Sequence, residues 1–298
     1  MPNLRDHNEG GYRGMYPSKN KPRNEYRVIL LGGSSVYIGD PTVAELLTEV
    51  FQKNGYSNVR VYNFGVISNN SSQELMTIVT EISELQPDLI IQYDGANDLY
   101  HPLYYDPRPG YPYDYLVYET SPLLYPKKLS AVKFLFYKNP LVRFIGERFF
   151  PNYYINQFLP LNQLRQEAGY GSDLWKERIA DTYVSNIMKA QKISEAFGSE
   201  YIAIFQPTVY LKKHVTEEEQ PILQPSETVY FNEVKMKILK KVSSSFNQNI
   251  PFIDLDPYFD AVEDTMFMDV MHVYQEKQLL IAQTIYNSII HKVSIPTY

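Results

Sequence analysis

The chain of 298 residues is 44% hydrophobic and 21% charged, which excludes intrinsic disorder as its main state. Its net charge of −6 argues against a general nucleic-acid binder, because such proteins need a positive surface. The absence of cysteine excludes disulfides, a thiolate nucleophile and cysteine-ligated metal sites.

Membrane and targeting signals are weak in this sequence. No apolar run approaches the roughly 20 residues of a transmembrane helix, and the start MPNLRDHNEGGYRG has no apolar segment resembling a secretion signal. We therefore expect a soluble protein without a stable transmembrane segment. The compartment stays open, with an extracytoplasmic location favoured if an N-terminal signal or anchor has been removed. The sequence predicts no particular oligomeric state.

The first part of the chain alternates predicted strands and helices. Residues 26–31 (YRVILL) form an apolar run that ends at two glycines, which is typical of a buried strand meeting a tight turn. A helix is predicted to start with Asp40 as N-cap and Pro41 as first residue, and to stop at Gly55. The elements that follow are a strand at 59–63, a helix opened by a Ser71 and Glu74 capping box, and a strand at 88–93.

The alternation resumes in the last part of the chain. The predicted elements are helix 173–197, strand 201–205, helix 227–246, strand 252–255 and helix 276–291. Strands separated by helices of this length require right-handed crossovers, which build a parallel sheet covered on both faces. The sequence therefore predicts an α/β class, with an N-terminal arm at 1–25 and a single domain at 26–298.

Residues 100–172 break this alternation and read as an insertion that serves as a lid or a substrate-binding elaboration. Eight tyrosines within 26 positions mark its start: Tyr100, Tyr104, Tyr105, Tyr111, Tyr113, Tyr115, Tyr118 and Tyr125. Because the tyrosine ring is stiff and amphipathic, such a cluster suits stacking on sugar rings or lining an acyl pocket. A satellite core beneath a long loop is the structural alternative.

Three short segments follow the first three predicted strands, where ligands gather in open α/β sheets. Gly32 and Gly33 allow a tight backbone path after the first strand and present Ser34 as a nucleophile. Gly65 follows the second strand and lets the backbone offer its N–H to a ligand. Asn97 follows the third strand. The N–H groups of Ser34 and Gly65 and the Asn97 amide would together form an oxyanion hole.

A nucleophilic serine needs a base, and the best candidate lies near the end of the chain. Asp269 and His272 are three residues apart, a spacing that brings a carboxylate against the imidazole of the same segment. Asp269 would hold one ring nitrogen while the other faces Ser34. Each segment alone is typical of an ordinary turn or cap, so only the combination points to chemistry.

In combination, these residues resemble the SGNH (GDSL-like) hydrolase family over about residues 26–99 and 174–292. The resemblance implies a flavodoxin-like three-layer α/β/α sandwich with a five-stranded parallel sheet. It also implies that Ser34, Asp269 and His272 are catalytic and that Ser34, Gly65 and Asn97 form the oxyanion hole. Gly33 stands where the family has aspartate, which removes a helper interaction but no triad member. Such Gly-Gly-Ser variants, and the leader at 8–14, are similar to members associated with bacterial surface polysaccharides.

Neighbouring polar residues give weaker expectations. Ser35 is a rival nucleophile, and Ser35, Asp98, Tyr100 and His101 are candidate substrate-binding residues. The sequence has no Walker loop, dinucleotide fingerprint or metal-ligand cluster, so we expect neither a cofactor nor a metal.

The function expected from these residues is that of a serine esterase. Its substrate would be a small-molecule or glycan ester of a short acyl group, of which acetyl on a carbohydrate is the leading candidate. The alternatives are an O-acyltransferase using the same site, a lipase or thioesterase, and a carbohydrate-binding module with a silent site.

Overall fold

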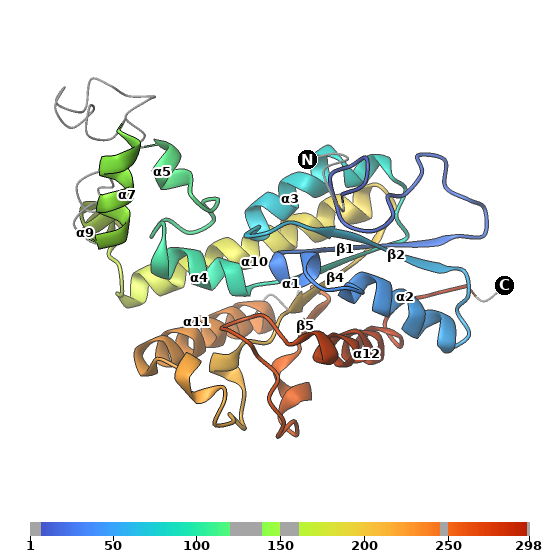
Figure 1. Cartoon of the computed structure of the whole chain (residues 1–298). Helices are drawn as coiled ribbons and strands as arrows, with labels where there is room; N and C mark the ends of the chain where they lie inside the picture. Colours follow the sequence, from blue (N-terminus) through green and yellow to red (C-terminus); the bar gives the residue numbers. More distant parts are fainter. Residues whose placement is uncertain (1–6, 120–138, 150–160, 245–249, 297–298) are drawn as a thin grey trace.

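The structure is a computed structural model of the chain that describes residues 7–119, 139–149, 161–244 and 250–296 (Figure 1). Five parallel strands form one sheet in the order β2-β1-β3-β4-β5. The strands are β1 (Tyr26–Gly32), β2 (Val59–Gly65), β3 (Leu89–Asp94), β4 (Glu200–Phe205) and β5 (Phe252–Asp254).

Ten α-helices surround or extend this sheet in the described residues. They are α1 (Ser34–Tyr37), α2 (Val43–Lys53), α3 (Ser71–Thr80), α4 (Ala96–Tyr104), α5 (Tyr115–Glu119), α7 (Pro140–Phe149), α9 (Leu161–Ala168), α10 (Asp173–Ala196), α11 (Pro225–Ser244) and α12 (Gln278–Ile289). Short 3₁₀ helices are η1 (Ile82–Glu84), η3 (Val209–Leu211), η4 (Gln220–Ile222), η6 (Asp256–Phe259) and η7 (Gln275–Lys277).

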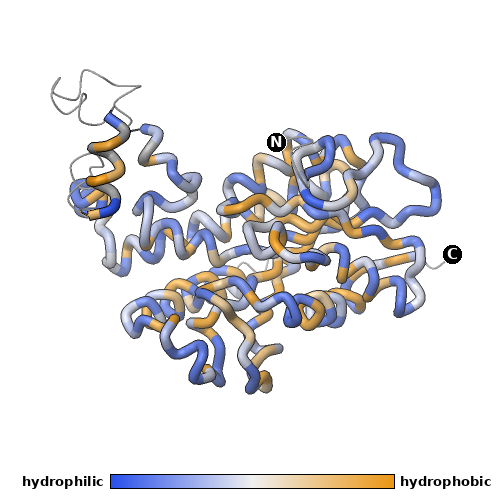
Figure 2. Tube along the Cα trace, in the orientation of Figure 1, coloured by the Kyte–Doolittle hydropathy of each residue, from blue (hydrophilic) through white to orange (hydrophobic). Residues whose placement is uncertain are grey.

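The helices form two layers. Helix α2 packs against α12, and α10 packs against both α3 and α11. Right-handed crossovers place these two groups on opposite faces of a parallel sheet. The strands are therefore buried on both sides, and Figure 2 shows hydrophobic stretches concentrated along them. This arrangement confirms the predicted three-layer α/β/α sandwich.

The strand ends meet in register along one edge of the sheet. Gly32, the last residue of β1, pairs with Gly65 of β2 and with Tyr93 of β3. Asp94 of β3 pairs with Phe205 of β4. The segments that follow these strands therefore emerge side by side, which is where the sequence placed the candidate site.

Two predicted helix starts were wrong by one or two residues. Helix α2 is capped by Thr42, whose side chain forms a capping box with Glu45, and not by Asp40. Helix α3 is capped by Asn70 with Gln73, and not by Ser71 with Glu74. Each segment contains two capping patterns one or two residues apart, and the packing of the folded chain determines which of them caps the helix.

The arm and the insertion are described in part. Residues 7–25 pack on the domain, and Tyr12 and Tyr16 each donate a hydrogen bond from the hydroxyl to Glu81 at 2.7 Å. The predicted insertion contributes α5, α7 and α9, which form a lobe to one side of the sandwich (Figure 1). Residues 120–138 and 150–160 of the insertion, which include Tyr125, lie outside the described residues.

Candidate active site

Ser34 lies at the start of α1, directly after β1 and Gly33. Its side chain is largely buried, with 9% of its surface exposed. Gly33 is required here by close packing, because a Cβ at this position would clash with the side-chain amide of Asn97. The absence of a side chain at Gly33 therefore makes room for the amide of Asn97 beside the serine loop.

Asp269 and His272 lie on a tight loop that a short antiparallel bridge closes. The N–H of Met268 donates to the carbonyl of His272 at 2.9 Å, and the N–H of Tyr274 donates to the carbonyl of Met266 at 3.0 Å. These two hydrogen bonds close the loop just before the segment that leads into α12. Its geometry follows from local backbone bonds, as the three-residue spacing predicted.

The structure brings Ser34, His272 and Asp269 into one hydrogen-bonded chain. The Oγ of Ser34 lies 2.6 Å from Nε2 of His272. The Nδ1 of the same ring lies 2.7 Å from Oδ2 of Asp269. An Nδ1–H that donates to the carboxylate leaves Nε2 as the acceptor of the serine O–H, which is the tautomer that base catalysis requires.

The carboxylate of Asp269 is held in its ionised form. Burial alone would raise its pKa, but hydrogen bonds from the His272 ring and from backbone N–H groups outweigh burial and lower it. Its Oδ1 accepts the N–H groups of Met271 at 3.0 Å and His272 at 2.9 Å. Both oxygens are thus engaged, which fixes the orientation of the imidazole.

Asn97 lies in the first turn of α4 with its amide beside the serine loop. Its Nδ2 donates to the carbonyl of Asn69 at 2.7 Å. An amide nitrogen carries two hydrogens, so the second remains for a ligand. The carbonyl of Asn69 thus orients the side-chain amide of Asn97, which the sequence predicted as an oxyanion donor.

Gly65 departs from the expectation. Its N–H donates to Oδ1 of Asn63 at 2.8 Å, and Nδ2 of Asn63 donates in turn to the carbonyl of Val36 at 2.9 Å. A backbone N–H has one hydrogen, so this group is already engaged and the prediction of a third oxyanion donor is not met in this structure. Gly65 instead packs closely against the backbone of α1.

Ser35 and Asp98 both form hydrogen bonds within the protein. The Oγ of Ser35 donates to the carbonyl of Met271 at 3.3 Å and accepts a hydrogen bond from Gln206 at 3.1 Å. Asp98 is 3% exposed and accepts hydrogen bonds from the N–H and hydroxyl of Ser71. The buried Asp98 therefore anchors the start of α3, in place of its predicted substrate-binding role. Ser35 braces the loop of the histidine, and its predicted contact with substrate stays a prediction.

Tyr100 and His101 lie one turn along α4 from Asn97. His101 is buried, and burial lowers its pKa to about 4, so the ring is neutral near pH 7. It packs against Tyr105 and Tyr113 at ring distances of 6.0 and 5.7 Å. The predicted contact of His101 with substrate is therefore replaced by a packing role, whereas Tyr100 remains partly exposed.

Three carboxyl groups form a buried cluster that the sequence did not reveal. Burial raises the pKa of Glu74, Asp94 and Asp98, and the charge of Asp94 raises the pKa of Glu74 and Asp98 further. The hydroxyl of Tyr183 donates to Asp94 at 2.8 Å and the amide of Gln92 donates to it at 2.7 Å. The cluster therefore retains protons at pH values where exposed carboxyl groups are ionised.

Glu219 is a second group that the sequence reasoning missed. Its fully buried carboxylate accepts the N–H groups of Met266 at 2.9 Å and Phe267 at 3.0 Å, at the base of the loop that carries His272. It also pairs with the buried Lys212 at 2.6 Å. Thr216 and Glu219 form a capping-box spacing, and that pattern was the available signal.

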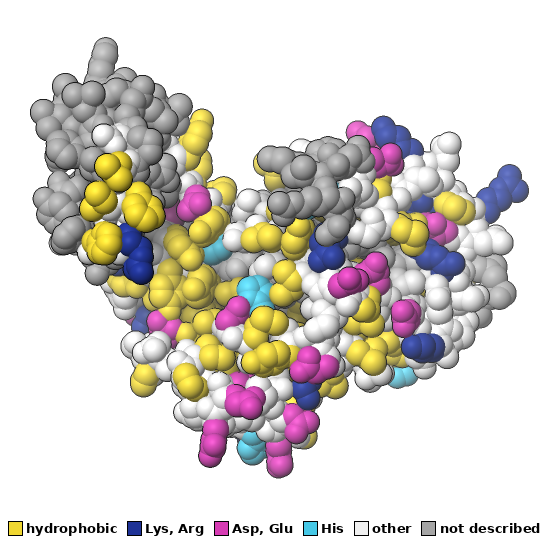
Figure 3. All heavy atoms as spheres, in the orientation of Figure 1, with side chains coloured by type: hydrophobic (Ala, Val, Ile, Leu, Met, Phe, Trp, Pro, Cys, Tyr) yellow, Lys and Arg dark blue, Asp and Glu magenta, His cyan; other side chains and the backbone are white. Residues whose placement is uncertain are grey.

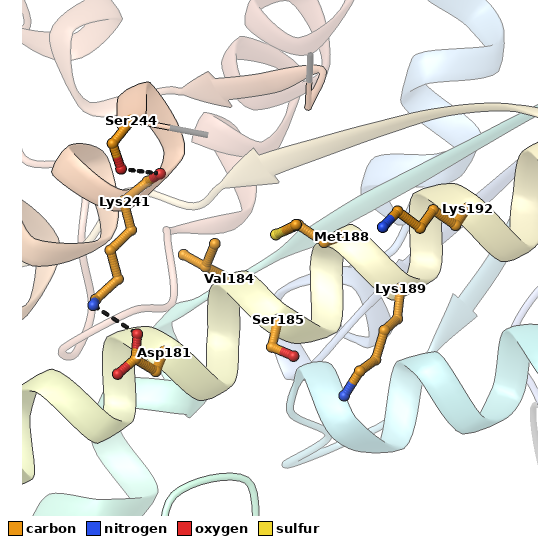
Figure 4. Close-up of a pocket in the computed structure, with 8 residues that line it drawn as sticks. All are labelled: Asp181, Val184, Ser185, Met188, Lys189, Lys192, Lys241 and Ser244. Atoms are coloured by element: carbon orange, nitrogen blue, oxygen red, sulfur yellow. Dashed lines mark hydrogen bonds and ion pairs between the residues drawn. The ribbon is translucent and has the colours of Figure 1, made fainter. Parts of the chain in front are cut away.

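A hollow with a volume of about 410 Å³ lies between α10 and α11 (Figure 4). Lys241 on its wall pairs with Asp181 at 2.6 Å. Ser185 and Lys189 also line it, but no hydrogen bond joins them among the described residues, and Figure 4 draws no contact between them. This hollow therefore lacks the linked nucleophile and base that Ser34 and His272 provide.

Metal-ligand clusters and membrane-spanning helices are both absent from the described segments. These segments contain no group of three or more His, Asp or Glu side chains arranged to hold a metal ion. Nor does any helix in these segments have the length and apolar character needed to cross a membrane.

The sequence matches no protein-family model and no curated protein. Among solved structures, it is similar to the acetyl xylan esterase AlAXEase, with 12% identity over 88% of this chain and 99% of that chain and a TM-score of 0.49. A GDSL-like lipase from Bacteroides thetaiotaomicron has 12% identity over 91% of each chain and a TM-score of 0.47. Axe2, an acetylxylan esterase from Geobacillus stearothermophilus, has 12% identity over 89% of this chain and 94% of that chain and a TM-score of 0.45. At these values the function has to be argued from the site itself.

Proposed function

We propose that the protein is a serine esterase that hydrolyses short acyl esters, with acetyl groups on a carbohydrate as the leading substrate. The observation that carries this proposal is the chain of contacts from Ser34 Oγ to His272 Nε2 at 2.6 Å and from His272 Nδ1 to Asp269 at 2.7 Å. Nucleophile, base and orienting carboxylate lie at hydrogen-bond distance in the order that acyl transfer needs.

The first half of the reaction forms an acyl-enzyme. Ser34 Oγ attacks the carbonyl carbon of the ester while its proton passes to Nε2 of His272. The tetrahedral intermediate then collapses, the bond to the alcohol oxygen breaks, and Nε2 returns the proton to that oxygen. The alcohol leaves, and the acyl group stays on Ser34.

Water completes the cycle. His272 takes a proton from a water molecule, which attacks the acyl carbon, and the second tetrahedral intermediate releases the acid as Ser34 regains its proton. Asp269 stays ionised throughout and stabilises the imidazolium.

Two donors support the oxyanion in this scheme. They are the N–H of Ser34 and the second amide hydrogen of Asn97, which Asn69 leaves available. The engaged N–H of Gly65 is not needed as a donor. We call Ser34, Asn97, Asp269 and His272 together the catalytic edge.

The surroundings support a ligand with both apolar and polar surface. Figure 3 shows hydrophobic side chains, a class that includes tyrosine, gathered in a hollow between the α5 and α7 lobe and the body of the domain. Aromatic walls beside a few convergent polar groups are typical of small-molecule sites. This composition favours a sugar ester over a fully apolar lipid.

The test is hydrolysis of p-nitrophenyl acetate by the wild type and by Ser34→Ala, with folding checked by circular dichroism. We expect kcat/KM to fall by about 10³-fold or more in the variant. Ser243→Ala is the matched control, because Ser243 is exposed and its hydroxyl donates to the carbonyl of Lys240 within α11. Equal turnover by wild type and Ser34→Ala would refute the assignment of Ser34 as nucleophile. Faster transfer of the acyl group to an added sugar than to water would identify an acyltransferase.

A further inference from the structure

Four tyrosines form a continuous aromatic surface that starts at α4, and we call Tyr100, Tyr104, Tyr105 and Tyr113 the tyrosine strip. Tyr100 contacts Tyr104 at a ring distance of 4.4 Å, and Tyr105 at 6.0 Å. Tyr105 contacts Tyr113 edge-on at 4.7 Å. The outer two rings expose 37% and 40% of their surface. The strip is therefore ordered by its own contacts yet open to solvent.

The strip begins at the catalytic edge. Residues three, four and seven apart share one face of a helix, so Tyr100 and Tyr104 continue the face of α4 that carries Asn97. The charge of Asp269 is among the causes that raise the pKa of Tyr100 to about 12, after burial and the neighbouring Tyr105 and Glu227. A ligand with its ester at Ser34 would thus extend along the strip.

An ion-pair cluster holds the loop that carries the outer rings. Arg108 donates two hydrogen bonds to Asp106, from Nε at 2.8 Å and from Nη2 at 2.6 Å. Asp106 is 3% exposed, and the guanidinium lies 4.0 Å above the ring of Tyr111. Bidentate pairing of this kind fixes direction as well as distance.

Backbone contacts tie the same loop to the rest of the domain. The indole N–H of Trp175 donates to the carbonyl of Pro107 at 2.7 Å. The amide of Asn70 donates to the carbonyl of Tyr111 at 2.8 Å, next to the residue that orients Asn97. The exposed rings are therefore held in place in advance, which reduces the entropy that binding would cost.

We propose that the tyrosine strip is the subsite for the carbohydrate part of the substrate, with sugar rings stacked on Tyr105 and Tyr113. The inference rests on the proposed esterase function. A pyranose ring has apolar C–H faces and hydroxyls at its edge, and tyrosine has an apolar face with a hydroxyl at its edge. An acyl chain on these solvent-open residues would keep much of its apolar surface in water, whereas the hydroxyls of a sugar stay hydrated there, so the sugar is the better match.

The experiment compares acetate esters that differ in the alcohol. Wild type, Tyr113→Ala, Tyr113→Phe and Tyr258→Ala are assayed with p-nitrophenyl acetate, ethyl acetate and fully acetylated trisaccharides of glucose, mannose and xylose. Tyr258 is the matched control because it is 52% exposed and lies outside the strip. We expect the kcat/KM of the wild type to be about tenfold higher for at least one trisaccharide than for ethyl acetate, because stacking of one or more sugar rings supplies a factor of this size.

The variants separate stacking from folding. Tyr113→Ala should raise KM for the preferred trisaccharide by about five- to tenfold relative to its effect on p-nitrophenyl acetate. Tyr113→Phe should restore most of this preference, because the ring remains, and Tyr258→Ala should leave it unchanged. No preference for any trisaccharide, or a preference that survives Tyr113→Ala, would overturn the strip as a sugar subsite. The same proteins are also assayed with p-nitrophenyl octanoate, and a loss in Tyr113→Ala confined to this ester would likewise overturn the proposal by assigning the strip to the acyl chain.

A binding measurement distinguishes failure of this inference from failure of the esterase function. Calorimetry of the same three trisaccharides, without acetyl groups, is carried out with Ser34→Ala and with Ser34→Ala combined with Tyr113→Ala. Weaker binding by the double variant supports the strip even if the wild type turns over no ester, an outcome that would refute only the esterase. Equal binding by both proteins, or binding by neither, refutes the strip even where ester turnover is intact.

Discussion

The catalytic edge and the tyrosine strip meet at the start of α4 but are built in different ways. Along the edge, Ser34, His272 and Asp269 are joined by hydrogen bonds of 2.6 and 2.7 Å, and a buried carboxylate supports the loop beneath them. Along the strip, the rings contact one another and expose up to 40% of their surface. Bond-making chemistry needs atoms fixed to a few tenths of an ångström, whereas stacking tolerates adjustment.

This contrast predicts two kinds of response to mutation. Changes on the edge should act on kcat, because they remove interactions made in the transition state. Changes on the strip should act on KM and only with substrates that carry a sugar. The predictions below test the contrast, beginning with the largest effect.

Removing the side-chain oxyanion donor should have the largest effect. Asn97→Ala is expected to lower kcat by roughly 10²- to 10³-fold with little change in KM, because the lost hydrogen bond forms with developing charge. Asn97→Asp keeps the shape but loses the N–H donor, so it should be equally impaired. Steady-state kinetics with p-nitrophenyl acetate make the measurement, and near-normal kcat in Asn97→Asp would remove this residue from the oxyanion hole.

Disturbing the support beneath the histidine loop should have the next largest effect. Glu219→Gln removes the carboxylate that pairs with Lys212, whose side chain is 1% exposed, and leaves its ammonium with the carbonyl of Asp264. It also weakens the hydrogen bonds that residue 219 accepts from Met266 and Phe267. We expect a loss of about 3 kcal/mol in the free energy of unfolding and a fall in kcat of about tenfold as His272 shifts.

Urea denaturation and kinetics measure both effects, with Glu218→Gln as the matched control from the same acidic run. Glu218 is exposed, so its change should leave stability and kcat within error. If the two variants behave alike, the hydrogen bonds of Glu219 do not support the loop.

The smallest effect is expected at His101, beneath the strip. Its pKa is lowered from 6.5 to about 4 by burial, so the unfolded chain binds a proton between these values while the folded chain does not. Stability from this residue is thus present above pH 6.5 and is lost as the pH falls toward 4. His101→Phe should remove up to about 2 kcal/mol of the destabilisation seen on going from pH 7 to pH 5.

Thermal denaturation at the two pH values compares the change in stability, so the cost of the substitution itself cancels. The same variant should keep the pH profile of kcat/KM that the wild type has, because the His101 ring packs against Tyr105 and Tyr113 and lies outside the triad. A displaced profile would instead place His101 in the chemistry.

The sequence by itself determined the fold class, and it predicted the four residues of the catalytic edge. Apolar runs such as 26–31 predict buried strands locally, and chain order then requires the segments after parallel strands to share one edge. Asp269 and His272 lie close in sequence, so their contact also follows from local geometry. The match to the SGNH pattern joined these pieces to Ser34.

Only the tertiary structure decided which hydrogen-bonding groups were already engaged. The N–H of Gly65 is bound to Asn63, the hydroxyl of Ser35 is bound to Met271, and Glu219 holds the base of the histidine loop. The sequence showed how many tyrosines this region contains, but not how their rings contact one another or how far they are exposed. A pattern specifies residue types and strand positions, whereas a hydrogen-bond partner more than 200 positions away, as for Ser35, is selected by packing of the whole chain.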